Sequence, residues 1–193
     1  MTAAFRHQPV MVDEVVELFG PVPRGVVVDA TVGGAGHAQA LLEAHPHIQV
    51  VGLDRDEAAV AAATTALRRF GDRATVRRAR FDQMTTIVRE LGHERLSGAL
   101  FDLGVSSHQF DEPDRGFSYR ADAPLDMRMD RTQPTTAATV VNEHPEAELA
   151  RILATYGDER FARRIAHAIV RARPLRTTGE LVEVITSTNS PVV

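Results

Sequence analysis

The sequence predicts an α/β fold in which a parallel sheet is covered by helices on both faces. Apolar, β-branched segments alternate with helical segments between residues 25 and 102, an order typical of right-handed βαβ units. A glycine-rich turn at residues 33–36 follows the first predicted strand, at the place where folds of this class bind ligands. Beyond residue 102 the pattern contains only loop and helix, so a helical region is expected to follow the sheet.

The elements of the predicted sheet follow one another in order. A short amphipathic helix at 9–19 ends at Gly20 and Pro21. Strands are expected at 25–29, 48–53, 74–78 and 97–102, and helices after the glycine turn through Leu41 and Leu42, at 57–67 and at 84–91. The first strand is a β-branched run, which is typical of strands buried on both faces. Only four strands are visible, so the sheet is expected to be incomplete in this chain.

The second half of the sequence predicts an irregular segment and then three helices. Residues 103–135 are rich in Asp, Arg, Pro, Ser and Gly and show little periodicity, and a loop of that length is usually functional. Helices are expected at 145–156, at 158–173 and from Thr177 onward, where Thr177 and Glu180 form a capping-box pattern. The inward residues of the second helix are expected to be Phe161, Ile165, Ala168 and Ile169. We therefore divide the chain into a sheet domain, 1–110, and a loop and helical region, 111–193.

Composition excludes several classes of protein. The 193 residues include no cysteine, which rules out disulfides, thiolate zinc sites and cysteine nucleophiles. No segment has the apolar length of a membrane span, and the first residues lack the apolar core of a signal peptide. No membrane partner and a cytoplasmic location are therefore expected. The formal net charge is -4, so any contact with nucleic acid must come from a local basic patch.

A nucleoside site is predicted where the first and second strands end. Glycines in the turn 33–36 let a ligand approach the backbone, and the helix that follows offers unpaired amides. Asp54 stands eighteen residues past Gly36, at the end of the second strand, where a carboxylate can accept both ribose hydroxyls of an adenine nucleoside. The alternative is that the glycines only form a tight turn. No metal site is expected, because no carboxylate stands at metal-ligand spacing from His37.

The spacing of the glycines decides against a dinucleotide. The G-x-G-x-x-G fingerprint of dinucleotide sites does not fit residues 33–37, which read Gly-Gly-Ala-Gly-His. An acid at the end of the first strand, Asp29, suits a methyltransferase better, because it can lie near the methionine end of S-adenosylmethionine. Phe81 and Asp82, after the third strand, can pack and hydrogen-bond near the adenine.

Motifs along nearly the whole chain, in order, carry a resemblance to one family. They are His7-Gln8-Pro9-Val10-Met11, the turn from Asp29 to His37, Asp54-Arg55-Asp56, the run from Asp102 to Gln109, Pro124-Leu125-Asp126-Met127-Arg128-Met129-Asp130, Tyr156-Gly157-Asp158-Glu159-Arg160 and Arg164-Ile165-Ala166. With these motifs the chain resembles the MraW-type ribosomal RNA methyltransferases. The runs that begin at Asp102 and Pro124 are the most specific of them.

The resemblance implies a Rossmann-like class I methyltransferase fold with an inserted helical subdomain that recognises the substrate. It also implies S-adenosylmethionine as the cofactor, and methylation of the exocyclic N4 of a cytidine in small-subunit (16S) ribosomal RNA. The cofactor contacts that it implies fall on Ala35, Gly36, His37, Asp54, Phe81, Asp102 and Gln109. The chain departs from the family at Ala35, where the family usually has Gly, and at His108, where it usually has Pro.

Length is the larger departure, because family members continue well beyond residue 193. The chain is therefore expected to be a fragment that binds the cofactor but transfers methyl groups weakly or not at all. Two outcomes are open for the incomplete sheet: its exposed apolar edge recruits a second copy and gives a homo-oligomer, or the helices after Pro145 cover it less well than the missing strands would.

The predicted reaction needs hydrogen acceptors around a poorly nucleophilic amine, which must be held in line with the methyl donor. Many amino-methyltransferases carry an Asp/Asn-Pro-Pro-aromatic motif after the fourth strand, and this chain has Leu103–Ser107 there instead. The carbonyls of this segment, with Ser106 or Ser107, are the expected acceptors. The alternative is that both serines only cap a turn. The reaction also requires an unstacked base.

Contacts with the small ribosomal subunit are expected from arginines that meet RNA phosphates: Arg115, Arg128, Arg160 and Arg164. In the predicted helix at 158–173, Arg160, Arg164, His167 and Arg171 can share one face opposite Phe161 and Ile165. The alternatives are a half-buried edge with charged outer residues around Arg128 and a merely solvated face on the helix. Two other functions stay open: a dinucleotide-dependent oxidoreductase, and a non-catalytic nucleoside- or ribosome-binding module.

Overall fold

The computed structural model describes residues 9–189 of the chain, apart from the side chains of Ser107, His108 and Asn189. The chain divides into two compact units, Met1–Ser106 and Ser107–Val193. The first unit holds the sheet and the first residues of the irregular segment, 103–106, and the second unit holds the rest of that segment and the helices that follow it. The sequence places this boundary four residues later, between residues 110 and 111.

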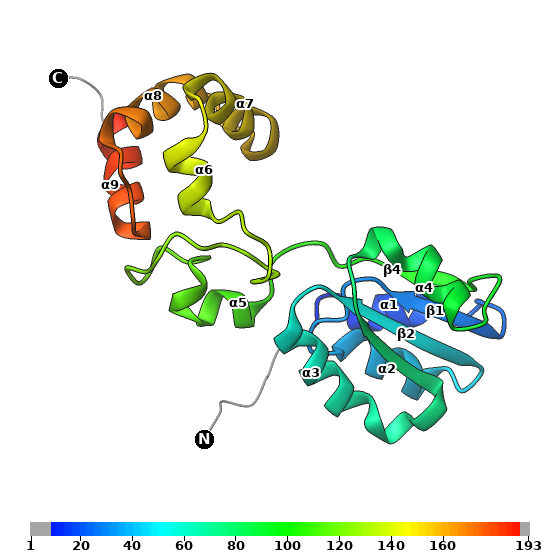
Figure 1. Cartoon of the computed structure of the whole chain (residues 1–193). Coiled ribbons are helices and arrows are strands. Elements are labelled where there is room, and N and C mark those ends of the chain that lie inside the picture. Colours follow the sequence, from blue (N-terminus) through cyan, green and yellow to red (C-terminus); the bar gives the residue numbers. More distant parts are fainter. Residues whose placement is uncertain (1–8, 190–193) are drawn as a thin grey trace. The chain divides into compact units, whose positions relative to one another are not determined.

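The first unit contains a four-stranded parallel sheet, which confirms the predicted fold class (Figure 1). Its strands are β1 (Gly25–Asp29), β2 (Ile48–Asp54), β3 (Ala74–Arg78) and β4 (Gly98–Leu100), in the spatial order β3-β2-β1-β4. All three neighbouring pairs are parallel. The chain therefore runs outward from β1 to β3 and then returns to the other side of β1.

Helices cover both faces of this sheet, because the side chains of β1 alternate between two apolar clusters. Val27 packs with residues of α1 (Val12–Phe19), α2 (Gly36–Ala44) and α3 (Glu57–Leu67) on one face. Val26 and Val28 pack with α4 (Met84–Glu90) on the other face. The strand is buried from both sides, as its run of β-branched residues predicts.

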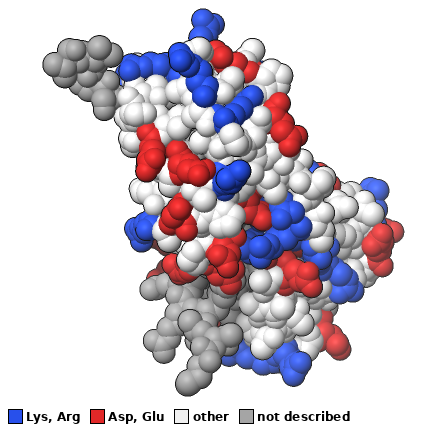
Figure 2. Space-filling model, turned by 60° about the vertical axis from the view of Figure 1, so that its left-hand side comes forward, with Lys and Arg blue, Asp and Glu red and all other residues white. Residues whose placement is uncertain are grey.

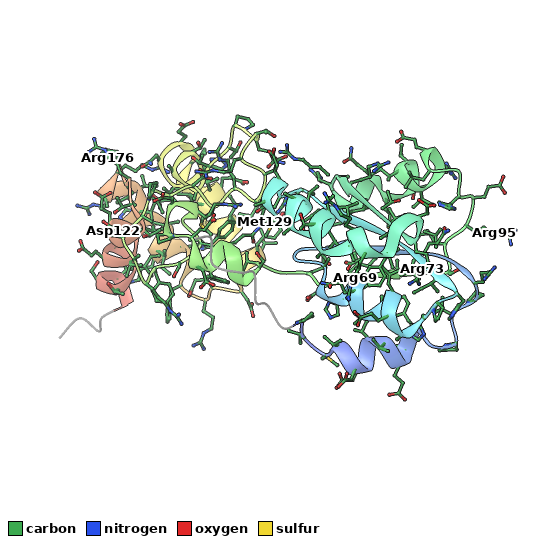
Figure 3. The ribbon with its side chains drawn as sticks, turned by 90° about the horizontal axis from the view of Figure 1, so that it is seen from below. Arg69, Arg73, Arg95, Asp122, Met129 and Arg176 are labelled. Carbon is green, nitrogen blue, oxygen red and sulfur yellow. The ribbon has the colours of Figure 1, made fainter. Side chains whose placement is uncertain are left out.

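The second unit is helical in its described part. Its α-helices are α5 (Ser107–Asp111), α6 (Ala137–Glu143), α7 (Glu146–Gly157), α8 (Ala162–Ala172) and α9 (Thr178–Asn189). Leu149, Ile165 and Ile169 belong to its apolar core. The irregular segment is fastened to the start of α9, because the Gly179 amide donates to the Asp122 carboxylate at 2.9 Å; Figure 3 labels Asp122.

Several predicted boundaries are wrong. The helix predicted at 158–173 begins only at Ala162, because Asp158, with a left-handed φ of 50°, ends α7. Phe161, predicted to point inward, precedes the helix and is 51 % exposed. The predicted strand at 97–102 is confined to 98–100, and the first helix begins at Val12 rather than at residue 9. Helix α6, which begins with a capping box formed by Thr136 and Thr139, is absent from the prediction.

Candidate functional site

Three aspartates mark the carboxyl edge of the sheet. Asp29 ends β1, Asp54 ends β2, and Asp102 lies two residues beyond the end of β4. Because all four strands are parallel, these ends lie at one edge, where open α/β sheets bind their ligands.

The glycine-rich turn after β1 is fastened to the end of β2. The Val32 amide donates to the Leu53 carbonyl at 2.9 Å, and the Gly33 amide donates to Oδ2 of Asp54 at 3.0 Å. Gly33 and Ala35 both have left-handed backbone, with φ of 48° and 68°. The turn therefore has a fixed shape, and it brings the N-terminus of α2 to the carboxyl edge of the sheet.

Both oxygens of the Asp54 carboxylate accept main-chain hydrogen bonds. Oδ2 accepts from Gly33, and Oδ1 accepts from the Asp56 amide at 2.9 Å. Burial raises the pKa of Asp54, and this effect outweighs the hydrogen bonds, which lower it. A carboxylate offers about four acceptor positions, and the amides of Gly33, Arg55 and Asp56 hydrogen-bond to it, so Asp54 keeps the capacity for one further donor, such as a ribose hydroxyl.

Asp29 is a buried carboxyl at the centre of this edge. It is 1 % exposed, and its Oδ1 accepts a hydrogen bond from the Thr31 amide at 3.2 Å. Burial raises the pKa of Asp29 to about 6; the hydrogen bond from Thr31 and the nearby His37 act in the opposite direction. Asp29 therefore changes charge close to neutral pH, which is typical of groups at functional sites.

His37 lies in the first turn of α2 and is held by the segment that precedes α1. Its Nε2 lies 2.8 Å from the Val10 carbonyl, so that this nitrogen donates, and its Nδ1 lies 3.9 Å from Oδ2 of Asp102. Pro9 packs against Gly36 so closely that a Cβ at position 36 would come within 2.1 Å of the proline ring. Only glycine fits at position 36 in this arrangement.

Two exposed phenylalanines form the aromatic part of the site. Phe81 follows β3 and Phe101 follows β4, and their rings meet edge to face with centroids 5.9 Å apart. They are 47 % and 42 % exposed, which is unusual for phenylalanine and leaves ring surface available to a base. The carboxylate of Asp82, predicted to hydrogen-bond near an adenine, is instead paired with Arg80 at 2.9 Å.

Ala35, the departure from the family pattern, has its methyl group in the core. Its side chain is fully buried and belongs to the apolar cluster that contains Val27, Val32 and Leu41. The methyl group therefore faces the interior of the unit. Glycine would suit the left-handed backbone of this position better, because it lacks the Cβ that strains it.

The segment after β4 exposes apolar side chains. Leu103 is 68 % exposed and Val105 is 39 % exposed, while Ser106 is half-buried. The side chain of Ser107, the second predicted acceptor, lies outside the described residues. Gln109, a predicted cofactor contact, belongs to the second unit, where its side chain is 6 % exposed.

Two of the four arginines predicted to meet RNA are engaged within the protein. Arg115 is only 4 % exposed and donates from Nη2 to the carbonyls of Arg128 and Met129 (Figure 3 labels Met129). Arg128 forms a two-pronged ion pair with Asp126, at 2.8 and 2.7 Å, and donates from Nη1 to the carbonyls of Arg131 and Gln133. These guanidinium groups brace the irregular segment, and their contact with RNA phosphates stays a prediction.

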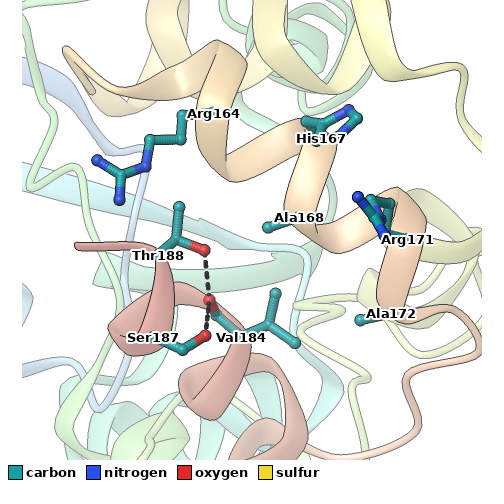
Figure 4. Close-up of a pocket in the computed structure, with 8 residues that line it drawn as sticks. All are labelled: Arg164, His167, Ala168, Arg171, Ala172, Val184, Ser187 and Thr188. Atoms are coloured by element: carbon teal, nitrogen blue, oxygen red, sulfur yellow. Dashed lines mark hydrogen bonds between the residues drawn. The ribbon is translucent and has the colours of Figure 1, made fainter. Parts of the chain in front are cut away.

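The other two arginines lie on the surface around α8. Arg160 is exposed beside the ring of Phe161, and Arg164 lines a shallow groove between α8 and α9 (Figure 4). His167 and Arg171 line the same groove, so these three members of the predicted face do lie together. Within the described part of the chain, Arg164 and Arg171 form no ion pair, whereas His167 lies 3.2 Å from Glu146. Figure 2 shows that acidic and basic side chains are otherwise interleaved on the visible face.

Comparison with known proteins identifies the family. Residues 4–192 match the MraW methylase family. The chain belongs to this family. The chain is 52 % identical over 186 residues to the ribosomal RNA small subunit methyltransferase H of Symbiobacterium thermophilum, and 52 % identical over 187 residues to that of Thermobifida fusca. These alignments cover 94 % of the chain but only 58 % and 57 % of the two relatives.

The family-like motifs that belong to the first unit lie together at the carboxyl edge of its sheet. The Gly33 amide joins the glycine-rich turn to Asp54, and His37 of the same turn lies close to Asp102. Phe101 is a member of this edge that the sequence analysis missed; the available signal was an aromatic residue directly after a predicted strand. Among the described residues, no cluster of His, Asp and Glu is arranged to hold a metal ion, and none of the described helices is long and apolar enough to cross a membrane.

Proposed function

We propose that this chain is the cofactor-binding part, with adjoining helices, of an S-adenosylmethionine-dependent methyltransferase that modifies the exocyclic N4 of a cytidine in 16S ribosomal RNA. The observation that carries the proposal is the family match over residues 4–192, together with the close relatives named as ribosomal RNA small subunit methyltransferases. The carboxyl edge of the sheet supplies the chemical support.

The residues of this edge fit S-adenosylmethionine. Asp54 has acceptor capacity left for a ribose hydroxyl, and the exposed ring of Phe81 can pack against the adenine. The cofactor also carries a cationic ammonium group and a cationic sulfonium. Asp29 and Asp102 supply negative charge at the ends of β1 and β4, where these cations would be neutralised. S-adenosylmethionine, when bound, supplies an electrophilic methyl group.

The segment 102–106 would then handle the nucleophile. The N4 amine conjugates with its ring, so it must be oriented and its hydrogens must be accepted as it becomes tetrahedral. We assign this task to main-chain carbonyls of the segment with Ser106, which ends the first unit. The exposed side chains of Leu103 and Val105 would help to exclude water from the unstacked base.

RNA contact is assigned to the groove between α8 and α9. Its lining residues Arg164 and Arg171 have no acidic partner in the described part of the chain, and Arg160 lies nearby in the sequence. The chain has no lysine, so its 22 Lys and Arg positions are all arginines. Arginine suits phosphate because its planar fork donates two hydrogen bonds at once.

Two measurements test the proposal. Calorimetric titration with S-adenosylmethionine, with a nicotinamide dinucleotide as the matched control, should show binding of the first ligand only. Labelled methyl transfer should then be sought on small ribosomal subunits that lack the modification. Labelled transfer would establish the activity in this chain, and binding without transfer would show a cofactor-binding part that is not active alone. Absence of cofactor binding would refute the assignment of the edge.

The RNA surface has its own test. Replacing Arg164 and Arg171 together by Gln should lower the slope of log affinity against log salt by roughly 1.4–1.8, because each phosphate contact contributes about 0.7–0.9. Arg95→Gln is the control, since Arg95 is exposed and lies in the first unit (Figure 3). An unchanged slope for the double variant would remove the groove from the proposal.

A further inference from the structure

The last hydrogen bond between the β1 and β4 sides of the sheet is accepted by a side chain, that of Thr31. The Ala30 amide donates to the Leu100 carbonyl at 2.9 Å, which continues the parallel pairing one residue past β1. Two residues beyond Leu100, where β4 has ended, the Asp102 amide donates at 2.8 Å to the hydroxyl oxygen of Thr31. A side-chain acceptor thus takes the place of a main-chain carbonyl at the last rung.

Thr31 is itself fixed on the β1 side of this rung. Its amide donates to Oδ1 of the buried Asp29. The next residue, Val32, donates to the Leu53 carbonyl of β2. The hydroxyl of Thr31 is therefore carried by a backbone that both neighbouring strands hold, and it reaches across to the chain that leaves β4.

This rung lies at the point where the order of the strands reverses. The chain proceeds from β1 to β2 and β3 on one side and returns to β4 on the other side. The reversal therefore falls between β1 and β4. In open α/β sheets the ligand crevice opens at such a switch point, outside the carboxyl ends of the strands. Thr31 thus joins the two walls of the predicted crevice.

We propose that Thr31 is a positioning residue that holds the segment 102–106 in the geometry needed for cofactor binding. This proposal rests on the proposed function. A hydrogen bond between two main chains would keep the segment alongside β1. The Thr31 side chain extends further than a main-chain carbonyl, so the segment can diverge from β1 while the Asp102 amide stays bonded. The carboxylate of Asp102 and the carbonyls that follow are then presented from a defined starting point.

Two substitutions separate the hydroxyl from the shape of the side chain. Thr31→Val keeps the volume and removes the acceptor, and Thr31→Ser keeps the acceptor. Thr64→Val is the matched control, because the Thr64 hydroxyl donates to Val60 within α3 at an exposed position. For each variant we would measure the affinity for S-adenosylmethionine by calorimetry, the hydrogen exchange rate of the Asp102 amide by nuclear magnetic resonance, and the melting temperature.

In Thr31→Val, the Asp102 amide should exchange at least fivefold faster, and the affinity should fall about fivefold, which corresponds to the roughly 1 kcal/mol of a typical net hydrogen bond. Thr31→Ser should restore both, and Thr64→Val should change neither. Wild-type affinity in Thr31→Val, or a fall that Ser does not restore, would overturn the positioning role. A wild-type chain that binds no S-adenosylmethionine would instead overturn the proposed function, and the role of Thr31 toward the cofactor with it.

Discussion

Replacement of Asp29 by Asn should remove a specific pH dependence from the stability of the chain. Asp29 is 1 % exposed, and burial raises its pKa from 3.8 to about 6. Because folding raises this pKa, the folded state holds the proton more tightly than the unfolded state does. The stabilisation from this group is complete below pH 3.8 and is lost as the pH rises through about 6. One pKa unit corresponds to about 1.4 kcal/mol, so ionisation of Asp29 lowers the free energy of unfolding by roughly 3 kcal/mol.

The Asn variant keeps a carbonyl oxygen that can accept from the Thr31 amide, and it carries no charge. Its NH2 group needs an acceptor of its own, which costs about 1–3 kcal/mol if none is found, but this cost does not vary with pH. Urea unfolding followed by circular dichroism should therefore be measured for both proteins from pH 4 to pH 8. From pH 4 to pH 8, the difference between their free energies of unfolding should move by roughly 2.4 kcal/mol in favour of Asn. A difference that stays constant across this range would refute the reasoning.

Three further outcomes are expected. Asp54→Asn should weaken binding of S-adenosylmethionine at least tenfold in calorimetry, because hydrogen bonds to a charged acceptor are worth about 1.5–3 kcal/mol each; wild-type affinity would exclude Asp54 from the ribose site. Ala35→Gly should change the free energy of unfolding by less than about 1 kcal/mol, because relief of left-handed strain (roughly 1–2 kcal/mol) opposes loss of a buried methyl group (about 0.8 kcal/mol). The affinity should stay within twofold, and a clear gain would show that the methyl group meets the ligand. Self-association through the edge of β4, where Ala99 and Phe101 are exposed, should appear in sedimentation and be abolished by Ala99→Lys; a wild-type monomer at all concentrations would disprove it.

The parts of the fold that the sequence predicts best are those in which one strong local signal acts alone. Strands β1 and β3 and helix α3 have the predicted bounds. In β1 the signal is a run of β-branched residues, and in α3 it is an alanine-rich segment whose N-cap, Asp56, accepts from the Ala58 amide. Propensity and burial agree in β1 and α3, so the tertiary structure does not change the locally preferred conformation there.

The predictions that fail depend on contacts between distant residues. β4 is shorter than its apolar run because the Asp102 amide is taken by Thr31, 71 positions away. α8 begins four residues later than predicted because Asp158 adopts a left-handed conformation at the end of α7. Aspartate tolerates this conformation, but its presence in the sequence does not predict it.

In the candidate site, too, features set by local sequence were predictable and features set by contacts in the folded chain were not. Asp54 is predictable because its distance from a glycine turn is a property of the βαβ unit. The internal contacts of Arg115 and Arg128 could not be predicted, because a run of charged residues gives no sign that local carbonyls and Asp126 accept hydrogen bonds from their guanidinium groups. Phe101 escaped notice because an apolar residue at the end of a strand is ordinarily part of the core.

The cost of ionising the buried Asp29 indicates which kind of ligand the carboxyl edge of the sheet suits. A buried carboxyl that costs roughly 3 kcal/mol when ionised is a costly choice if it serves only to accept the Thr31 amide, because the uncharged carbonyl oxygen of Asn could accept the same hydrogen bond. A carboxylate is useful there if a cation enters the site, because a neighbouring positive charge lowers its pKa and recovers the cost of burial. Asp54 and Asp102 increase this cost through like-charge repulsion. Three carboxylates around one crevice, with His37 as a partly compensating neighbour, therefore form an arrangement whose stability is improved by a cationic ligand. This is the electrostatic property that the ammonium and sulfonium groups of S-adenosylmethionine would satisfy, and that a dinucleotide with its anionic pyrophosphate would not.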